Sequence, residues 1–289
     1  MNLEIVPVKA DSAFFSDAVS FLKLREYRAV SLASHLCADG APSYPGKQIA
    51  DFSCLVDEGG NIDGILLRTA SGILLHCFRE GADVAKAESR KGALTAFLRN
   101  ATVRCVIGPG DDTRLIESAL RAQPYQVVDY RLMRLETPAD PSLATLGSEY
   151  TLRRALPSDT DDLLPLQEGY EKEEVLPPGD LFDRNVCRSL LLITLKKQHI
   201  NLISVEGLPV AKAGTNARGF ATDQIGGVYT DPQWRGKNLA TALVVHTAIE
   251  LMAEGRKVVL FVKPQNASAC RVYEKIGFFP DSPFRISYF

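Results

Sequence analysis

The segment 226–240, GGVYTDPQWRGKNLA, constrains the fold more than any other part of the chain. Residues 225–230 are β-prone and end at an Asp-Pro pair, which terminates a strand because proline lacks an N–H and restricts the residue before it. Apolar residues at three- and four-residue steps then predict a helix over residues 239–252, with Gly255 where a helix C′ residue is expected. The segment therefore predicts a strand, a sharp turn and a helix.

The turn itself has the chemistry of a phosphate-binding element. Arg235, Gly236, Lys237 and Asn238 occupy the predicted helix N-terminus. Free N–H groups and the positive end of the helix dipole lie there, Gly236 permits a positive φ, and two cations flank it. A bound pyrophosphate would be well stabilised at this point. The alternative is an ordinary strand-to-helix connection with a solvated arginine and lysine.

A second strand and helix follow. Residues 258–262 form an apolar, β-branched run, and Asn266 is a good N-cap for a short helix over residues 267–276 that Gly277 closes. The full order is a strand, a basic glycine turn, a helix, an apolar strand and an Asn-capped helix. In this order the chain resembles the GNAT superfamily of N-acetyltransferases.

Two motifs carry the resemblance. The acyl-CoA loop of the family, Gln/Arg-x-x-Gly-x-Gly/Ala, matches residues 235–240, RGKNLA, with Asn238 in place of a loop glycine. Asparagine tolerates left-handed backbone geometry and caps helices, so the turn can survive. The second motif, an Asn followed seven residues later by Tyr and then by Glu-Lys-x-Gly-Phe, matches residues 266–278, NASACRVYEKIGF.

The resemblance implies an α/β (α+β) chain of two GNAT-like domains, each with a mixed, mostly antiparallel central sheet flanked by helices. It also implies acetyl-CoA as co-substrate, with no metal. The residues that it implies in coenzyme A binding are Val228, Tyr229, Thr230, Arg235, Gly236, Lys237, Asn238, Leu239, Ala240, Thr241, Asn266 and Tyr273.

Acetyl transfer from a thioester to an amine needs a neutral amine, a donor for the tetrahedral oxyanion and a proton for the leaving thiolate. The resemblance puts main-chain groups of residues 228–230 against the pantetheine and the acetyl carbonyl. The preceding Gly226 and Gly227 indicate a bulge or a close backbone approach, or merely relieve crowding. Tyr273 is the implied proton donor; a tyrosine that packs its ring in the core is the alternative.

The general base is the least defined position. Many relatives place a carboxylate on the strand before the capping asparagine, where this chain has Phe261. The nearest candidates are Glu173 and Glu174, in an acidic connection between two predicted helices, and Asp223, at the start of the strand that precedes the basic turn. Family geometry puts the acidic connection over the acceptor site, where it would attract a cationic amine. The alternative is a solvated charged face. None of the four histidines is assigned a role.

The first half shows the same order of elements. The patterns predict helices over 14–36, 83–98 and 112–122, and strands over 52–57, 62–68, 73–78, 103–107 and 125–135. Where a pyrophosphate loop would stand, the chain has REGAD at residues 79–83, whose acids would cap the next helix and repel phosphate. We therefore expect a degenerate GNAT-like domain over residues 1–137, without a coenzyme A loop.

Residues 138–149 contain two prolines and small polar residues, which predicts a linker, and the acetyltransferase domain is expected over 150–289. Within it, the patterns predict strands over 150–155, 200–205 and 209–213, and helices over 157–169 and 181–195.

The composition is that of a globular protein. Hydrophobic residues make up 46% and charged residues 24%, and the net charge is −2, so neither disorder nor electrostatic nucleic-acid binding is indicated. No apolar run approaches the roughly 20 residues of a membrane span, and the amino terminus lacks a signal peptide's apolar core, so a cytoplasmic protein is expected. Six scattered cysteines predict free, buried thiols.

Two classes of function remain open. The first is an N-acetyltransferase whose acceptor is a small-molecule amine or a protein amino group, with no nucleic-acid or membrane partner. The second is a non-catalytic acyl-CoA-binding sensor or scaffold, which a degenerate first half makes conceivable. The sequence identifies neither the acceptor nor the oligomeric state.

Overall fold

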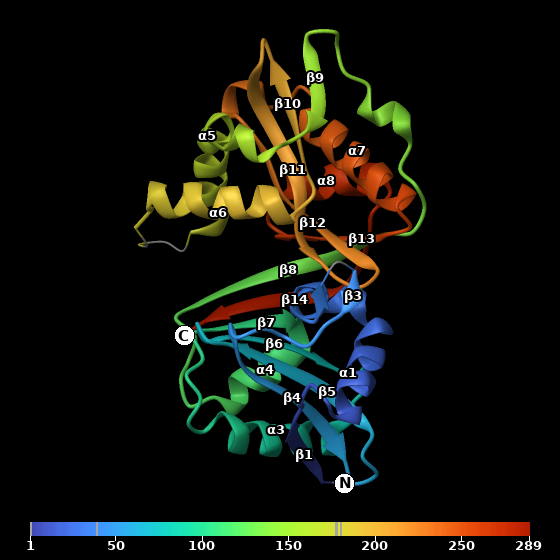
Figure 1. The fold of residues 1–289 in the computed structure, drawn as a ribbon, viewed down its shortest axis with the longest axis vertical. Helices are drawn as coiled ribbons and strands as arrows, with labels where there is room; N and C mark the ends of the chain where they lie inside the picture. The colour runs from blue at the N-terminus through green and yellow to red at the C-terminus, as the bar shows by residue number, and fades with distance from the viewer. Residues whose placement is uncertain (1, 39, 177–178, 180) are drawn as a thin grey trace.

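The computed structural model describes residues 2–38, 40–176, 179 and 181–289. The first and second halves of the chain occupy opposite ends of an elongated molecule, and long strands cross between them (Figure 1). None of the helices in these ranges has both the length and the apolar character that a membrane span requires.

The α-helices are α1 (Ala13–Lys23), α2 (Val30–His35), α3 (Val84–Leu98), α4 (Gly110–Ala119), α5 (Thr160–Tyr170), α6 (Arg184–Lys197), α7 (Leu239–Ala253) and α8 (Ala267–Ile276). The strands of the main sheet are β1 (Leu3–Pro7), β4 (Ile49–Asp57), β5 (Ile62–Thr69), β6 (Ile73–Phe78), β7 (Cys105–Pro109), β8 (Gln126–Leu135), β9 (Tyr150–Arg154), β10 (Ile200–Val205), β11 (Leu208–Arg218), β12 (Thr222–Thr230), β13 (Lys257–Val262) and β14 (Phe279–Tyr288). Two short strands, β2 (Cys37–Ala38) and β3 (Ala41–Pro42), form a separate pair.

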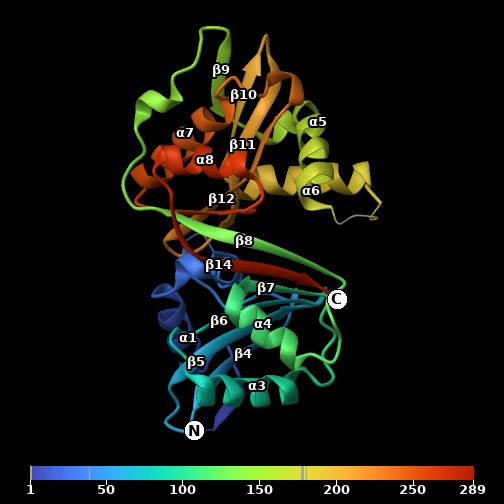
Figure 2. The same ribbon diagram turned by 180° about the vertical axis from the view of Figure 1, so that it is seen from behind.

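The main sheet is continuous through both halves, in the order β1-β4-β5-β6-β7-β14-β8-β13-β12-β11-β10-β9. The last strand of each half pairs with the other half. In the register, β14 places Phe284 opposite Pro109 of β7, and β8 places Leu132 opposite Phe261 of β13. Figures 1 and 2 show β8 and β14 side by side across the middle of the molecule. The two halves are therefore joined by backbone hydrogen bonds as well as by the chain connection.

In the second half, helices cover both faces of the sheet (Figure 1). Helices α7 and α8 bury one core against β10–β13, which includes Leu243 and Ile225. Helices α5 and α6 bury another on the opposite face, which includes Leu191 and Leu202. Successive residues of a strand point to opposite faces, so each side chain of β11 or β12 contacts one helix pair or the other.

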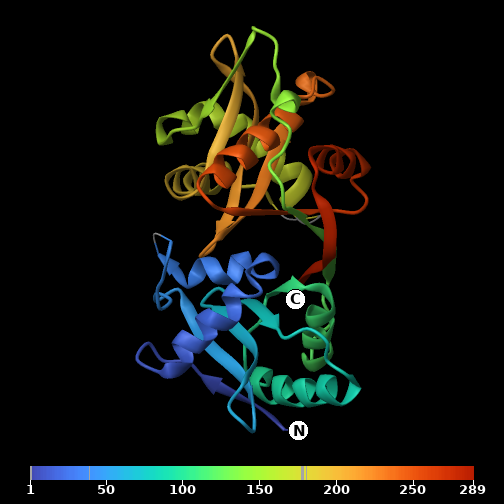
Figure 3. The ribbon, with the colours of Figure 1, turned by 90° about the vertical axis from the view of Figure 1, so that its right-hand side faces the viewer.

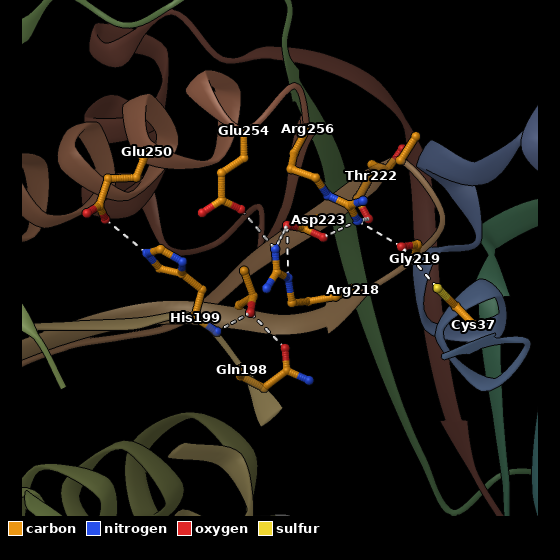
Figure 4. Close-up of polar contacts among 12 residues, drawn as sticks. Cys37, Gln198, His199, Arg218, Gly219, Thr222, Asp223, Glu250, Glu254 and Arg256 are labelled. Atoms are coloured by element: carbon orange, nitrogen blue, oxygen red, sulfur yellow. Dashed lines mark hydrogen bonds and ion pairs between the residues drawn. The ribbon is translucent and has the colours of Figure 1, made fainter. Parts of the chain in front are cut away.

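The hairpin between β11 and β12 reaches the first half of the chain. Glu26 is buried there and accepts hydrogen bonds from the Ala221 N–H at 3.1 Å and the Thr222 hydroxyl at 3.0 Å. Figure 3 shows the blue helices of the first half against the tip of this hairpin. On the other side of the hairpin, Arg218 and Arg256 bind the two carboxylate oxygens of Asp223 (Figure 4).

Most predicted elements are confirmed, with shifts at their ends. The single helix expected over residues 14–36 is wrong: α1 ends at Lys23, a 3₁₀ turn covers Glu26–Arg28, and α2 follows. This break lets the Glu26 carboxylate reach the hairpin of the second half. All six cysteines are free, and all but Cys37 are buried, as expected.

The predicted linker, residues 138–149, packs closely on the second half. It contains a 3₁₀ turn, Pro141–Ala144, and Leu143 packs against the core that α7 forms. The division of the chain at residues 137 and 150 stays a prediction. Strand β14 lies between β7 and β8, and β8 pairs with β13, so one sheet runs through both halves.

Candidate active site

The strands β12 and β13 run parallel and then separate. Their pairing extends from Thr222 opposite Lys257 to Ile225 opposite Leu260, although β12 continues to Thr230 and β13 to Val262. Main-chain groups of β12 beyond residue 225 that face β13 therefore have no ladder partner on that strand. This opening is at the position where the GNAT resemblance implies contact with a thioester.

A bulge in β12 lies at the same point. Lys212 of β11 pairs with Tyr229, whereas Gly214 pairs with Gly226, so β12 has an additional residue in this interval. Gly227 has a φ of 60°, in the left-handed region that glycine adopts readily. The bulge predicted from the paired glycines is thus present, and it turns the backbone where β12 separates from β13.

The turn before α7 has the predicted left-handed geometry. Gly236 has a φ of 78° and Asn238 a φ of 64°, and α7 begins at the next residue. Asn238 makes no side-chain cap; its side-chain N–H₂ instead donates to the Leu143 carbonyl at 3.2 Å. Asparagine thus keeps the turn that glycine provides in the motif and also holds the linker. The first N–H groups of α7 lack partners within the helix, as in any α-helix.

The two cations of the turn differ in their contacts. Arg235 donates to the Thr230 carbonyl at 3.1 Å and binds Glu173. Lys237 is exposed, with its ammonium 4.1 Å from the centre of the Trp234 ring. Lys237 is therefore available to an anionic ligand, whereas Arg235 already has a carboxylate partner.

The acidic connection forms the π-helical turn Glu171–Val175 after α5. Its Glu173 carboxylate accepts hydrogen bonds from Arg235 at 2.7 and 3.0 Å and from the Tyr229 hydroxyl at 2.8 Å, and these donors lower its pKa. Glu174 accepts from the Lys263 ammonium at 3.0 Å, just beyond the end of β13. The structure therefore brings both predicted glutamates to the separated strands, one on each side.

The second motif forms α8 and its cap. The Asn266 side-chain oxygen accepts from the Ala269 N–H at 3.0 Å, which is the predicted N-cap, and Gly277 ends the helix with a φ of 108°. Tyr273 faces the core of the second half, 8% exposed, with its ring edge against Phe278. Burial and the nearby Tyr170 and Glu174 raise the pKa of Tyr273, so its phenol stays protonated.

Asp223, the third carboxylate considered as a base, is excluded by its contacts. Its side chain is fully buried at the paired end of β12, and both oxygens are bound by guanidinium groups. These contacts anchor the hairpin and leave no oxygen of Asp223 free for a substrate proton.

Comparisons with known proteins agree with this geometry. A family model described as FR47-like protein matches residues 215–282, which include the turn before α7 and the α8 motif. No curated protein matches the chain. A solved tandem GNAT protein from the clavulanic acid biosynthesis pathway is 13% identical, with a TM-score of 0.61 over 99% of this chain and 98% of that one. This chain has a tandem GNAT fold.

Two further structures extend over the whole chain. A Drosophila protein is 13% identical, with a TM-score of 0.66 over 99% of this chain and 98% of that one. A GNAT-family acetyltransferase from Colwellia psychrerythraea is 11% identical, with a TM-score of 0.54 over 99% of each chain. At these identities the likeness concerns the fold, and it confirms the predicted fold class.

Three residues of the candidate site were missed in the sequence. Lys212 is buried and donates to the Gly227 carbonyl at 3.0 Å, and the Tyr170 hydroxyl hydrogen-bonds Asn216 and the Gly227 main chain. One signal was present in the sequence: Lys212 stands alone among apolar residues in a predicted strand, where a charge needs a specific partner. Tyr170 and Asn216 had no comparable signal.

The first half differs at the equivalent place. Pairing of β6 with β7 ends at Leu75 opposite Ile107, and the next residue, His76, turns its ring against Gly108. His76 contacts the Thr113 hydroxyl at 2.9 Å, and burial lowers the pKa of His76 to about 3. A neutral imidazole therefore packs against Gly108, just beyond the paired part of these strands.

The turn after β6 has acidic rather than basic chemistry. Glu80 pairs with Arg25 at 3.1 Å and with Arg28 at 2.7 Å, and the Asp83 carboxylate caps α3 by accepting from the Lys86 N–H. The predicted cap is thus confirmed. Compared with the second half, the charges are reversed: the turn is acidic and the connection between the first two helices is basic.

Proposed function

We propose that this protein is an acetyl-CoA-dependent N-acetyltransferase that transfers the acetyl group to a primary amine by direct attack on the thioester. The observation that carries the proposal is the separation of β12 from β13 at a glycine bulge, followed by a left-handed basic turn at the start of α7. The tandem GNAT fold supports it. The acceptor is a small-molecule amine or a protein amino group.

The residues at this place fit coenzyme A. Beyond the part of β12 that pairs with β13, the Thr230 hydroxyl is buried without a hydrogen-bond partner among the described residues. The turn supplies N–H groups and cations for a pyrophosphate, from Arg235 through Thr241, and main-chain groups of Val228–Thr230 suit the amide groups of a pantetheine arm. Bound acetyl-CoA would supply an activated thioester.

The other residues of the candidate site have roles that follow from their contacts. We assign Tyr273 as the donor of a proton to the departing thiolate, since its raised pKa keeps the hydroxyl protonated. We assign Glu173 and Glu174 to the attraction and deprotonation of a cationic amine. Glu174 is the better placed of the two for an acceptor, because Arg235 and Tyr229 both bind Glu173, whereas Glu174 accepts from Lys263 through one of its two oxygens.

The test combines binding and turnover. We expect titration calorimetry to detect acetyl-CoA binding to the full chain, and a panel of amines and peptides to release free coenzyme A thiol. Mass spectrometry must then find the acetyl group on nitrogen, as an amide stable to hydroxylamine. Binding without turnover on any acceptor would favour the alternative, an acyl-CoA-binding sensor or scaffold, and absence of binding would overturn both.

A further inference from the structure

Lys212 belongs to β11 and lies opposite the bulge of β12. Its side chain is on the face of the sheet that α5 and α6 cover. Its neighbours Ala211 and Ala213 both pack in the core formed with α7, so the lysine between them points to the opposite face. Tyr229, its partner on β12, packs in the core that α5 and α6 form. The Lys212 side chain is 4% exposed, which is unusual for a residue that carries a charge.

The partner of this ammonium group is the main chain. Its nitrogen donates to the Gly227 carbonyl at 3.0 Å and lies 4.7 Å from the centre of the Tyr170 ring. A Cβ at Gly227 would lie 3.4 Å from the same nitrogen, which shows how closely the lysine approaches the bulge. The lysine thus holds the Gly227–Val228 peptide group, which lies within the bulge of β12.

The orientation of that peptide group also determines the direction in which the Val228 N–H points. The chain contains no cis peptide bonds among its described residues, so the Val228 N–H points opposite to the Gly227 carbonyl. The ladder agrees: the Asp231 N–H donates to Val210 on the β11 side, and N–H groups alternate along a strand. The Val228 N–H therefore points away from β11, toward the side where β13 has separated.

We propose that Lys212 is a positioning residue for acetyl transfer, which holds the Gly227 carbonyl and thereby aims and polarises the Val228 N–H toward the thioester carbonyl oxygen. The proposal rests on the proposed function. A cation on the carbonyl side of an amide draws electron density from the N–H, which strengthens that group as a donor to a developing negative charge.

The charge of Lys212 depends on its surroundings. The ionisable groups around it are Tyr170 of α5, Glu171 of the π-helical turn and Cys187 of α6. Burial lowers the pKa of Lys212 to about 8, and Glu171 and Cys187 oppose that shift. The ammonium form is therefore dominant below that pH, and the polarising charge is lost as the pH rises above it.

The experiment measures the carbonyl stretching band of bound acetyl-CoA labelled with ¹³C at the acetyl carbonyl, by difference infrared spectroscopy without an acceptor. In the parent chain we expect a shift to lower frequency relative to free acetyl-CoA. The shift should be larger at about pH 7 than at about pH 9, on either side of the lysine's lowered pKa. Lys212→Met should remove most of the shift and its pH dependence.

Kinetic measurements separate positioning from binding. Lys212→Met should lower kcat by about 10²-fold, as expected when an oxyanion donor is lost, and change the KM for acetyl-CoA far less. Lys212→Arg keeps a cation whose pKa is well above the assay range, so it should restore much of kcat without the alkaline decline. Lys257→Met, an exposed lysine at the start of β13, is the matched control and should behave as the parent.

Lys212→Met is expected to fold, because it replaces a buried charge with an apolar side chain of similar length. Thermal unfolding checks this point. A carbonyl band in Lys212→Met equal to that of the parent, with acetyl-CoA bound, would overturn the positioning role alone. Absence of acetyl-CoA binding to the parent chain would overturn the proposed function and this inference with it.

Discussion

The Glu173 carboxylate and the Arg235 guanidinium form an ion pair across the start of α7, with N–O distances of 2.7 and 3.0 Å. Arg235 is the first residue of the basic turn, and Glu173 belongs to the acidic connection after α5. The Glu173 carboxylate therefore binds the same guanidinium group that a pyrophosphate would bind. If coenzyme A binds at this turn as proposed, its binding and the position of the acidic connection are coupled.

This coupling predicts that Glu173→Gln tightens acetyl-CoA binding. The substitution removes the competing negative charge, and half-exposed pairs of this kind are worth only about 0.2–1 kcal/mol, so the Kd should fall by up to about 5-fold. Titration calorimetry at low and high salt measures it, since the difference should shrink as salt screens the pair. Glu88→Gln, an exposed carboxylate on α3, is the control. Weaker binding in Glu173→Gln would mean that the carboxylate helps to form the site.

A second prediction concerns stoichiometry: one acetyl-CoA should bind per chain. In the first half, His76 packs against Gly108 just beyond the paired part of β6 and β7, and Glu80 occupies the turn, where its charge would repel phosphate. Calorimetry with the full chain gives the number of sites directly. Two equivalents of similar affinity would show that the first half retains a site. Lys237→Glu, in the turn of the second half, should weaken the single site without unfolding the chain.

The local chemistry of the site was predictable from short stretches of sequence. Gly236 and Asn238 both adopt the left-handed conformation that their residue types favour, and Asn266 and Gly277 cap the two ends of α8. Each of these features depends on neighbours within a few residues. Residue type and spacing are sufficient for them.

The long-range arrangement was not predictable in this way. No strand was predicted over β14, whose neighbours are β7 and β8. Even where alternation predicts a strand, it determines the buried face and says nothing of which strand pairs alongside. The break after α1 has the same origin, since the partners of Glu26 lie 195 and 196 residues away in the sequence. Lys212 likewise depends on a bulge in a different strand.

The contact of Glu26 with the hairpin predicts a stability effect. Glu26→Ala should leave the buried Thr222 hydroxyl and the Ala221 N–H without their carboxylate partner, at a cost of about 1–3 kcal/mol. Chemical denaturation measures the free energy of unfolding. Glu4→Ala, an exposed carboxylate on β1, is the control and should change it little. An unchanged midpoint and slope for Glu26→Ala would show that the hairpin is held to the first half by other contacts.

The last prediction tests Tyr273, whose buried ring and protonated hydroxyl fit a structural or a catalytic role. Tyr273→Phe keeps the ring against Phe278 and removes only the hydroxyl, so the thermal midpoint should change little. If the hydroxyl protonates the thiolate, kcat should fall by about 10²-fold while the affinity for acetyl-CoA stays similar. The raised pKa of the phenol adds a condition: the proton stays on the hydroxyl across the assay range, so the loss should be independent of pH.

The matched control is Tyr125→Phe, which removes the hydroxyl of an exposed tyrosine just before β8. Its kcat should equal that of the parent. The decisive measurement is a single-turnover experiment, because slow product release would conceal a change in the chemical step. Tyr273→Phe with a chemical step within about twofold of the parent would assign thiolate protonation to water or another donor, since a lost general acid costs far more. The buried tyrosine would then serve to pack α8 against the sheet.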